Sequence, residues 1–332
     1  MKQNTHRFPK FLLGLFLTLF SVSPISAENS HFCSDYARQS VLQHIHNLKG
    51  SCHLNGDHWS PLLRKQQNWC LEHDTSLVTH TLQTRTQQLK QCGHRSMQRA
   101  LDWKELPYRT KNNLMAAVIH ATQVDDIASV RLFEAQGVDL DFEWQMTQGG
   151  LLYWAISHQA PQVCHYLIEE KQADPTLSRN GGPNPLVNLL NNTPNVNYRL
   201  LRYLLQKGAM PNHGGEDFSE VSLPLPVATA NNDLQAVSIL LEHQADPNLF
   251  EVIPPLMIAI DQNNARLVDV LLTAGADPNM GFSHLNCKKI HHEQLEGEYL
   301  PLDRARQNNN PRIIKLLNEA GAVSSEQCVL KH

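Results

Sequence analysis

A short phrase of the type Gly-Ala-Asp-Pro-Asn returns along most of the chain, and this internal repeat constrains the fold more than any other feature. Four copies lie at residues 172–175, 208–212, 244–248 and 275–279, and weaker copies lie at 137–139 and 321–322. Each copy follows an apolar stretch with helical spacing, which is itself preceded by a shorter apolar stretch. Repetition of one helix pair predicts a solenoid, in which each unit buries its apolar face on its neighbours.

The units align on the residue that opens the first helix, which is followed by Leu in the four units opened by Pro. The units open near Ala117, Leu151, Pro185, Pro224, Pro255 and Pro301, at spacings of 34, 34, 39, 31 and 46 residues. Four residues later a column of small or aliphatic residues reads Ala121, Ala155, Leu189, Ala228, Ala259 and Ala305. A small side chain in this column lets helices within and between units approach closely.

The phrase and the Pro-Leu opening together resemble the ankyrin repeat over roughly residues 111–323. The resemblance implies an all-α ankyrin-repeat solenoid of about six helix-pair units with hairpin or loop fingers, which recognises another protein. In that family the Gly of the phrase adopts the left-handed conformation after the second helix, and four copies fit: Gly137, Gly208, Gly275 and Gly321. Gln172 and Gln244 replace it elsewhere and are expected to cost about 1 kcal/mol each.

The copies also depart from the family pattern. The His of the opening is replaced by Tyr153, Val187, Pro226, Met257 and Asp303, so looser fingers and a less stable array are expected. The longest spacing places Cys287 in an extended finger, and Cys328 follows the last unit. We expect a Cys287–Cys328 disulfide to tether that finger. Cys164 lies in the column of Val130 and Val237, which predicts a buried free thiol.

The N-terminus has the pattern of a secretory signal peptide. Lys2, Arg7 and Lys10 precede an apolar run over residues 11–20, and Ser26-Ala27 follows Pro24. Cleavage after Ala27 is expected, which assigns residues 1–27 to the signal and places the mature chain in the periplasm or outside the cell. Removal of three basic residues and no acid changes the net charge from −4 to −7.

Residues 28–105 resemble a four-cysteine module found at the N-termini of exported bacterial proteins. Apolar spacing predicts one helix from Cys33 to Lys49, a second opened by Ser60-Pro61, and a third ending near Cys92. Up-down-up packing of the three helices favours Cys33–Cys70 and Cys52–Cys92 among the three possible connectivities. The remaining assignments are residues 106–323 for the array and 324–332 for a C-terminal tail.

Composition and motifs argue against several function classes. The acidic charge disfavours a nucleic-acid binder, and no apolar run in the mature chain reaches the length of a bilayer span. His291-His292-Glu293 lacks metal-ligand spacing, and no nucleophile motif of the Gly-x-Ser-x-Gly type occurs. We therefore expect no enzyme activity, no metal, no cofactor and a monomeric chain.

The functional signal lies in two columns of the first helices, which the ankyrin resemblance places on a concave face. Apolar residues at three of these exposed positions suggest anchors for a partner protein. The candidate partner-binding residues are His120, Trp154, Ser157, Asn188, Val227, Ile258, Asp261 and Arg304. The alternative is a protein that binds cell wall or a small ligand through the four-cysteine module, with Trp59, Trp69 and Tyr36 as its recognition residues and the repeats as a spacer.

Overall fold

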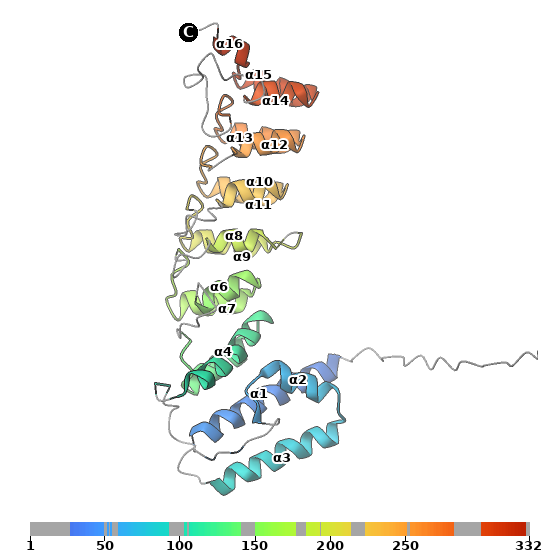
Figure 1. The fold of residues 1–332 in the computed structure, drawn as a ribbon, viewed down its shortest axis with the longest axis vertical. Coiled ribbons are helices and arrows are strands. Elements are labelled where there is room, and N and C mark those ends of the chain that lie inside the picture. The colour runs from blue at the N-terminus through green and yellow to red at the C-terminus, as the bar shows by residue number, and fades with distance from the viewer. Residues whose placement is uncertain are drawn as a thin grey trace, which may run out of the picture.

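Six helix pairs follow one another along the chain and stack into an elongated array (Figure 1). The computed structural model describes residues 27–49, 52, 54, 59–92, 103–104, 106–140, 150–176, 184–192, 194–213, 223–250, 253–281 and 300–329, and those residues contain helices but no strand. The pairs are α4 (Tyr108–Gln123) with α5 (Ile127–Ala135), α6 (Leu151–Ser157) with α7 (Pro161–Glu169), α8 (Pro185–Leu190) with α9 (Tyr198–Gln206), α10 (Pro224–Ala230) with α11 (Leu234–Glu242), α12 (Pro255–Asp261) with α13 (Ala265–Thr273), and α14 (Pro301–Gln307) with α15 (Pro311–Glu319).

Local sequence sets the helix starts. Proline occupies the first position of the first helix in four units, where its fixed φ suits a helix and its missing N–H costs nothing. Most second helices begin after an Asp or Asn whose side chain accepts a backbone N–H of the first turn, as Asp233 does from Ala236. The exception among the openings is α4, which begins at Tyr108 rather than near Ala117, because its extra turns pack against the N-terminal helices.

The column of small residues lies at the centre of the array. All six members are fully buried: Ala121, Ala155, Leu189, Ala228, Ala259 and Ala305. They belong to one hydrophobic cluster that continues through every unit. Because the cluster has no break between units, each pair of helices depends on its neighbours for burial.

The residues that follow the second helices adopt the left-handed conformation. Gly208 and Gly275 have φ of 101° and 92°, and Gln172 and Gln244 follow the same path with φ of 56° and 67°. The two glutamines therefore adopt the strained conformation that the repeat demands. A second set of left-handed residues, which the sequence pattern did not predict, follows the first helices: Asp125, Gln159, Asn232, Asn263 and Asn309.

The final Asn of the repeated phrase links the third, fourth and fifth units each to the unit that follows. Asn248 donates from Nδ2 to the carbonyl of Gly275, at 3.0 Å, and accepts at Oδ1 from the backbone N–H of Asp277, at 2.7 Å. Asn212 and Asn279 repeat the same paired hydrogen bonds with the units that follow them. The three side chains form an asparagine ladder, which satisfies backbone groups that the left-handed turn leaves unpaired.

Three helices precede the array: α1 (Ala27–Lys49), α2 (Leu63–Leu71) and α3 (Thr75–Cys92). The prediction that Ser60-Pro61 opens the second helix, with Ser60 as its cap, is wrong, because α2 begins at Leu63 without a side-chain cap. The Ser60 hydroxyl instead accepts the N–H of Leu62, two residues on, which closes a local turn before the helix.

Among the described residues, one of the three expected disulfides is present with both of its cysteines. Cys33 and Cys70 form a disulfide with an S–S distance of 2.08 Å, and Cys52 is also disulfide-bonded. Cys164 is free and buried, as its apolar column predicts, and burial raises the pKa of its thiol. The side chains of Cys92, Cys287 and Cys328 lie outside the described residues, as do residues 1–26 and most of each finger.

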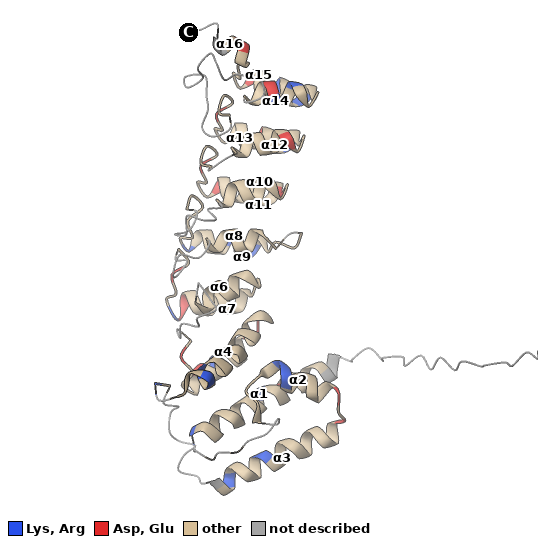
Figure 2. Ribbon diagram, in the orientation of Figure 1, with Lys and Arg blue, Asp and Glu red and all other residues tan. Residues whose placement is uncertain are grey.

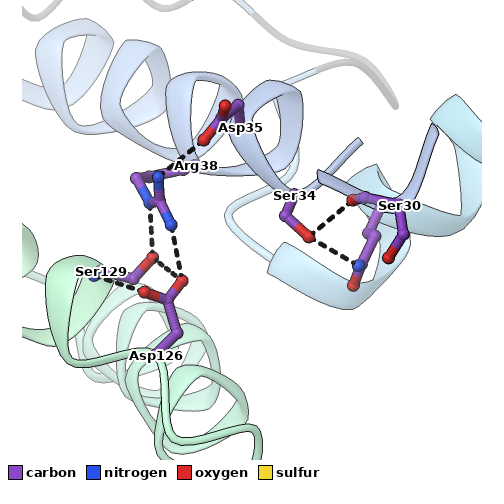
Figure 3. A network of polar contacts seen from close by, with 7 residues as sticks. Ser30, Ser34, Asp35, Arg38, Asp126 and Ser129 are labelled. Atoms are coloured by element: carbon purple, nitrogen blue, oxygen red, sulfur yellow. Dashed lines mark hydrogen bonds and ion pairs between the residues drawn. The ribbon is translucent and has the colours of Figure 1, made fainter. Parts of the chain in front are cut away.

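Polar contacts from the middle and from the C-terminal end of α1 join the three N-terminal helices to the first unit. In the middle of α1, Arg38 donates from Nη2 to Asp126 Oδ2, at 2.9 Å, and from Nε to Ser129 Oγ, at 2.8 Å (Figure 3). At the C-terminal end, Lys49 Nζ lies 2.9 Å from Gln136 Oε1. These contacts fix the orientation of α1 on α5 and on the turn after it.

The same helices share their apolar core with the array. Val41, Ile45 and Leu63 belong to the buried cluster that includes Leu114 and Val118 of α4. A second, smaller buried cluster surrounds the Cys33–Cys70 disulfide. The N-terminal helices therefore cover the apolar end of the solenoid, which a repeat array needs for solubility. At the opposite end lies α16 (Ser325–Val329), where the N–H of Ser325 donates to Asp303.

Candidate functional site

The first helices of the six units lie side by side, because α4, α6, α8, α10, α12 and α14 each contact the next in turn. All eight candidate residues lie on these helices: His120, Trp154, Ser157, Asn188, Val227, Ile258, Asp261 and Arg304. Asp261 is exposed and the other seven are half-buried. We call this continuous surface the first-helix strip. Its three parts differ in chemistry.

The N-terminal part of the first-helix strip is polar and incompletely hydrogen-bonded. Trp154 Nε1, Ser157 Oγ and Asn188 Nδ2 are shielded from solvent and have no hydrogen-bond partner among the described residues. The Trp154 ring stacks on His158, with ring centroids 5.3 Å apart. Three donors without acceptors on neighbouring helices are unusual, since buried polar groups in folded proteins are normally paired.

The middle of the strip is apolar. Val227 and Ile258 occupy the same position on α10 and α12, and both are half-buried. Trp154 and Val227 pack against the core of the array, so part of each side chain serves stacking between units. The sequence interpretation of these residues as surface anchors therefore applies only to the fraction that remains accessible.

The C-terminal part of the strip is ionic. Arg304 Nε lies 2.5 Å from Asp261 Oδ1, and its Nη1 lies 2.8 Å from Gln307 Oε1. The structure therefore joins Asp261 and Arg304, which the sequence proposed as separate candidates. Both side chains are about one third exposed, so the pair contributes little to stability and remains available for exchange with a partner's charges.

A groove that the sequence did not reveal extends the strip toward the N-terminal helices. It has a volume of about 670 Å³ and lies between α2, with Leu63, Arg64 and Trp69, and α4, with Ile119 and His120. Burial lowers the pKa of His120, a hydrogen bond with Gln123 opposes that shift, and the Arg64 charge adds to it. Helical spacing placed His120 on the surface, but only the packing of α2 on α4 encloses it.

The aromatic residues proposed as a recognition head do not form an open platform. Tyr36 and Trp59 are 3% and 7% exposed, and Trp69 is half-buried between Tyr36 and His73, stacked at 5.5 and 4.5 Å. Their rings form the interior of the N-terminal helices. Any ligand of this region would have to reach a pocket between helices instead of a flat aromatic surface.

Basic and acidic residues are unevenly divided along the chain. Residues 28–105 contain nine Lys and Arg against seven Asp and Glu, whereas residues 106–332 contain 16 against 25. Figure 2 shows Lys and Arg on α2 and α3, and acidic residues distributed along the stacked pairs. The acidic array favours contact with a surface of positive charge.

No cluster of three or more potential metal ligands occurs among the described residues. His291-His292-Glu293 lies outside them. Within the same residues, no helix has the length and apolarity that a membrane crossing requires.

Comparison with known proteins agrees with the geometry of the helix pairs. Residues 254–281, which contain α12 and α13, match the ankyrin repeat family model. Together with the stacked pairs and the repeated phrase, this match defines an all-α ankyrin-repeat solenoid. No curated protein matches the chain.

Several solved structures resemble the chain. An ankyrin repeat domain from Acinetobacter baumannii AYE has 24% identity and a TM-score of 0.49, over 62% of this chain and 98% of that one. The ankyrin repeat domain of Bcl-3, described as a unique member of the IkappaB protein family, has 22% identity and a TM-score of 0.48, over 63% and 87%. The human ASB11 ankyrin repeat domain has 20% identity and a TM-score of 0.45, over 64% and 96%.

Proposed function

We propose that this protein is a non-catalytic scaffold that binds a partner protein through the first-helix strip and acts as a monomer in the periplasm or outside the cell. Ankyrin repeats are typical of protein–protein interaction modules, and a preformed array loses little entropy when a partner docks. The observation that carries the proposal is the continuity of the strip across six helices, with accessible apolar and polar groups together.

The partner surface follows from the parts of the strip. Trp154 and Asn188 are half-buried, and the parts of their side chains that remain exposed offer aromatic and polar surface to a partner. Val227 and Ile258 offer an apolar centre. This order of polar, apolar and ionic groups matches the general anatomy of protein interfaces, in which an apolar core lies within a polar rim.

Affinity capture from the native cell tests the proposal. The bait is residues 28–332, and the test variant is Trp154→Ala/Ile258→Ala. The matched control is Tyr203→Ala/Val270→Ala, which truncates half-buried residues on second helices instead. We expect a partner that wild type and control retain and the strip variant loses, with all three equally folded by circular dichroism. Retention by all three would place the binding surface elsewhere, and purified partner would then be needed to locate it.

Export is supported by the charge and apolar pattern of residues 1–27 and by the disulfides at Cys33 and Cys52, because structural disulfides persist in oxidising compartments. Cell fractionation followed by N-terminal sequencing tests this part separately. We expect the exported form to begin at Glu28. An intact N-terminus in the cytoplasm, with thiols free to alkylation, would contradict it.

A further inference from the structure

Arg85 on α3 is a buried cation that has no counter-ion among the described residues. Its side chain is 2% exposed, and its guanidinium lies over the Trp59 ring, 4.7 Å from the centroid. Nη2 donates to the carbonyl of Ser40 on α1, at 2.7 Å. Nε and Nη1 have no acceptor, and no carboxylate of the described residues pairs with the group. A buried charge normally requires a partner of opposite charge.

Other buried polar groups lie around Arg85. The buried hydroxyl of Ser40 on α1 also lacks a hydrogen-bond partner among the described residues, and the Tyr36 hydroxyl, one turn earlier, lies close enough to Arg85 to oppose the effect of burial on the Arg85 pKa. Burial lowers the pKa of His44 to about 4, so this neighbour is neutral at pH 7 and adds no charge. Burial also lowers the pKa of Arg85 to about 10, which leaves it protonated. The cluster thus holds one positive charge and several unused donors.

A pocket at the surface of the N-terminal helices borders Arg85 and Trp59. It has a volume of about 390 Å³, and Trp59, Leu77, His80, Thr84 and Arg85 are among its lining residues. One wall is apolar, since Trp59 presents its ring and Leu77 is 44% exposed. The other wall is polar, and there Thr84 Oγ1 lies 3.5 Å from His80 Nδ1. This size and mixture of surfaces are typical of small-molecule sites.

We propose that this pocket binds a small organic monocarboxylate, with the carboxylate on Arg85 and a flat apolar body between Trp59 and Leu77. A carboxylate supplies the acceptor oxygens that the guanidinium lacks, in a geometry that suits arginine. One unpaired positive charge matches one negative charge, which favours a carboxylate over a phosphate dianion. The inference goes beyond the scaffold function, because it assigns a ligand to the N-terminal helices and not to the array.

Isothermal titration of the mature chain with benzoate tests the site. Benzamide has the same shape without the charge, and inorganic phosphate has charge without the apolar body. We expect saturable binding of benzoate and at least tenfold weaker binding of the other two probes. Equal binding of benzamide, preferred binding of phosphate, or no binding of benzoate would each overturn the proposal.

Two sets of variants locate the binding. Arg85→Met should abolish benzoate binding and leave the melting temperature unchanged or higher, because it removes an uncompensated buried charge. Lys90→Met, at an exposed position of α3, is the matched control and should bind as wild type does. If Arg85 serves only to support the helices, Arg85→Met will lower the melting temperature and benzoate will not raise that of wild type.

A variant at the pocket mouth keeps the test decisive if Arg85→Met does not fold. Leu77→Glu places a negative charge at an exposed position beside the ligand path, and Leu77→Gln places a neutral group of the same size there. We expect the Glu variant to bind benzoate at least tenfold more weakly than the Gln variant. Equal affinities would exclude this pocket as the binding site.

Discussion

Arg38 on α1 contacts Asp126, the residue that caps α5, with 2.9 Å between Nη2 and Oδ2. Asp126 also accepts the backbone N–H of Ser129, so one carboxylate both starts a helix of the array and holds the N-terminal helices (Figure 3). The side chains of Arg38 and Asp126 are 24% and 22% exposed, which protects the pair from full solvent screening. This contact makes the orientation of α1 dependent on the first unit.

Replacement of Arg38 by Met should destabilise the chain by about 1–3 kcal/mol, because Asp126 then loses a charged donor in a partly buried site. Urea unfolding followed by circular dichroism measures the change. Asp35→Ala is the control, since Asp35 is 63% exposed and forms only a surface pair with the same arginine. That variant should change stability by less than about 0.5 kcal/mol. Equal effects of the two substitutions would show that the Arg38–Asp126 contact does not stabilise the fold.

Acid should weaken the same junction. Burial alone would raise the pKa of Asp126, but hydrogen bonds from Ser129 and Arg38 outweigh it and hold the pKa below its usual value. A depressed carboxyl pKa contributes stability above the unfolded pKa of about 4, and this contribution is lost as pH falls through the folded value. Wild type should therefore lose more stability between pH 6 and pH 3 than Asp126→Asn. Parallel pH profiles would assign the acid sensitivity to other groups.

The asparagine ladder should be a main source of coupling between units. Asn248→Ala removes a donor to Gly275 and an acceptor for Asp277, so a loss of about 1–3 kcal/mol is expected in chemical denaturation. Asn318→Ala removes an exposed asparagine from the surface of α15 and should be nearly neutral. A cost for Asn248→Ala no larger than that of the control would mean that solvent replaces the ladder without loss.

Gln244→Gly should stabilise the array by about 0.5–1 kcal/mol, because the position has φ of 67° and glycine adopts that conformation without a steric penalty. The reciprocal change, Gly275→Ala, should be destabilising by about 1 kcal/mol. A Cβ at Gly275 would meet no atom within 4 Å, so its cost reports the backbone conformation alone. Thermal unfolding of both variants should give shifts of opposite sign, and shifts of the same sign would contradict the assignment.

Repetition made the array predictable from sequence. Five openings, Leu151, Pro185, Pro224, Pro255 and Pro301, are the first residues of their helices, because the same start signal recurs in register. The position of a residue within the repeat also predicts its environment. Cys164 occupies the position of a valine in other units, which predicts the buried free thiol that the structure has. Local signals repeated several times are more informative than any single copy.

Features that depend on contacts between distant segments could not be predicted in this way. The length of α4 and the groove around His120 arise where α2 packs on the array. The burial of Arg85 results from its contacts with Ser40 on α1 and with Trp59. Both residues are distant from Arg85 in the sequence, and no recurring pattern relates them to it. Trp154 lies on the first helix of its unit, α6, and its partial burial depends on how closely the neighbouring units approach.

The asparagine ladder also has a direction. Each ladder side chain belongs to the end of one unit and bonds to the backbone of the unit that follows, as Asn248 does with Gly275. During synthesis a completed unit therefore presents a donor and an acceptor to the segment that leaves the ribosome next. The series begins at Asn212 in the third unit and runs to the last unit. Over these three junctions, the order in which the ladder can form matches the order of translation.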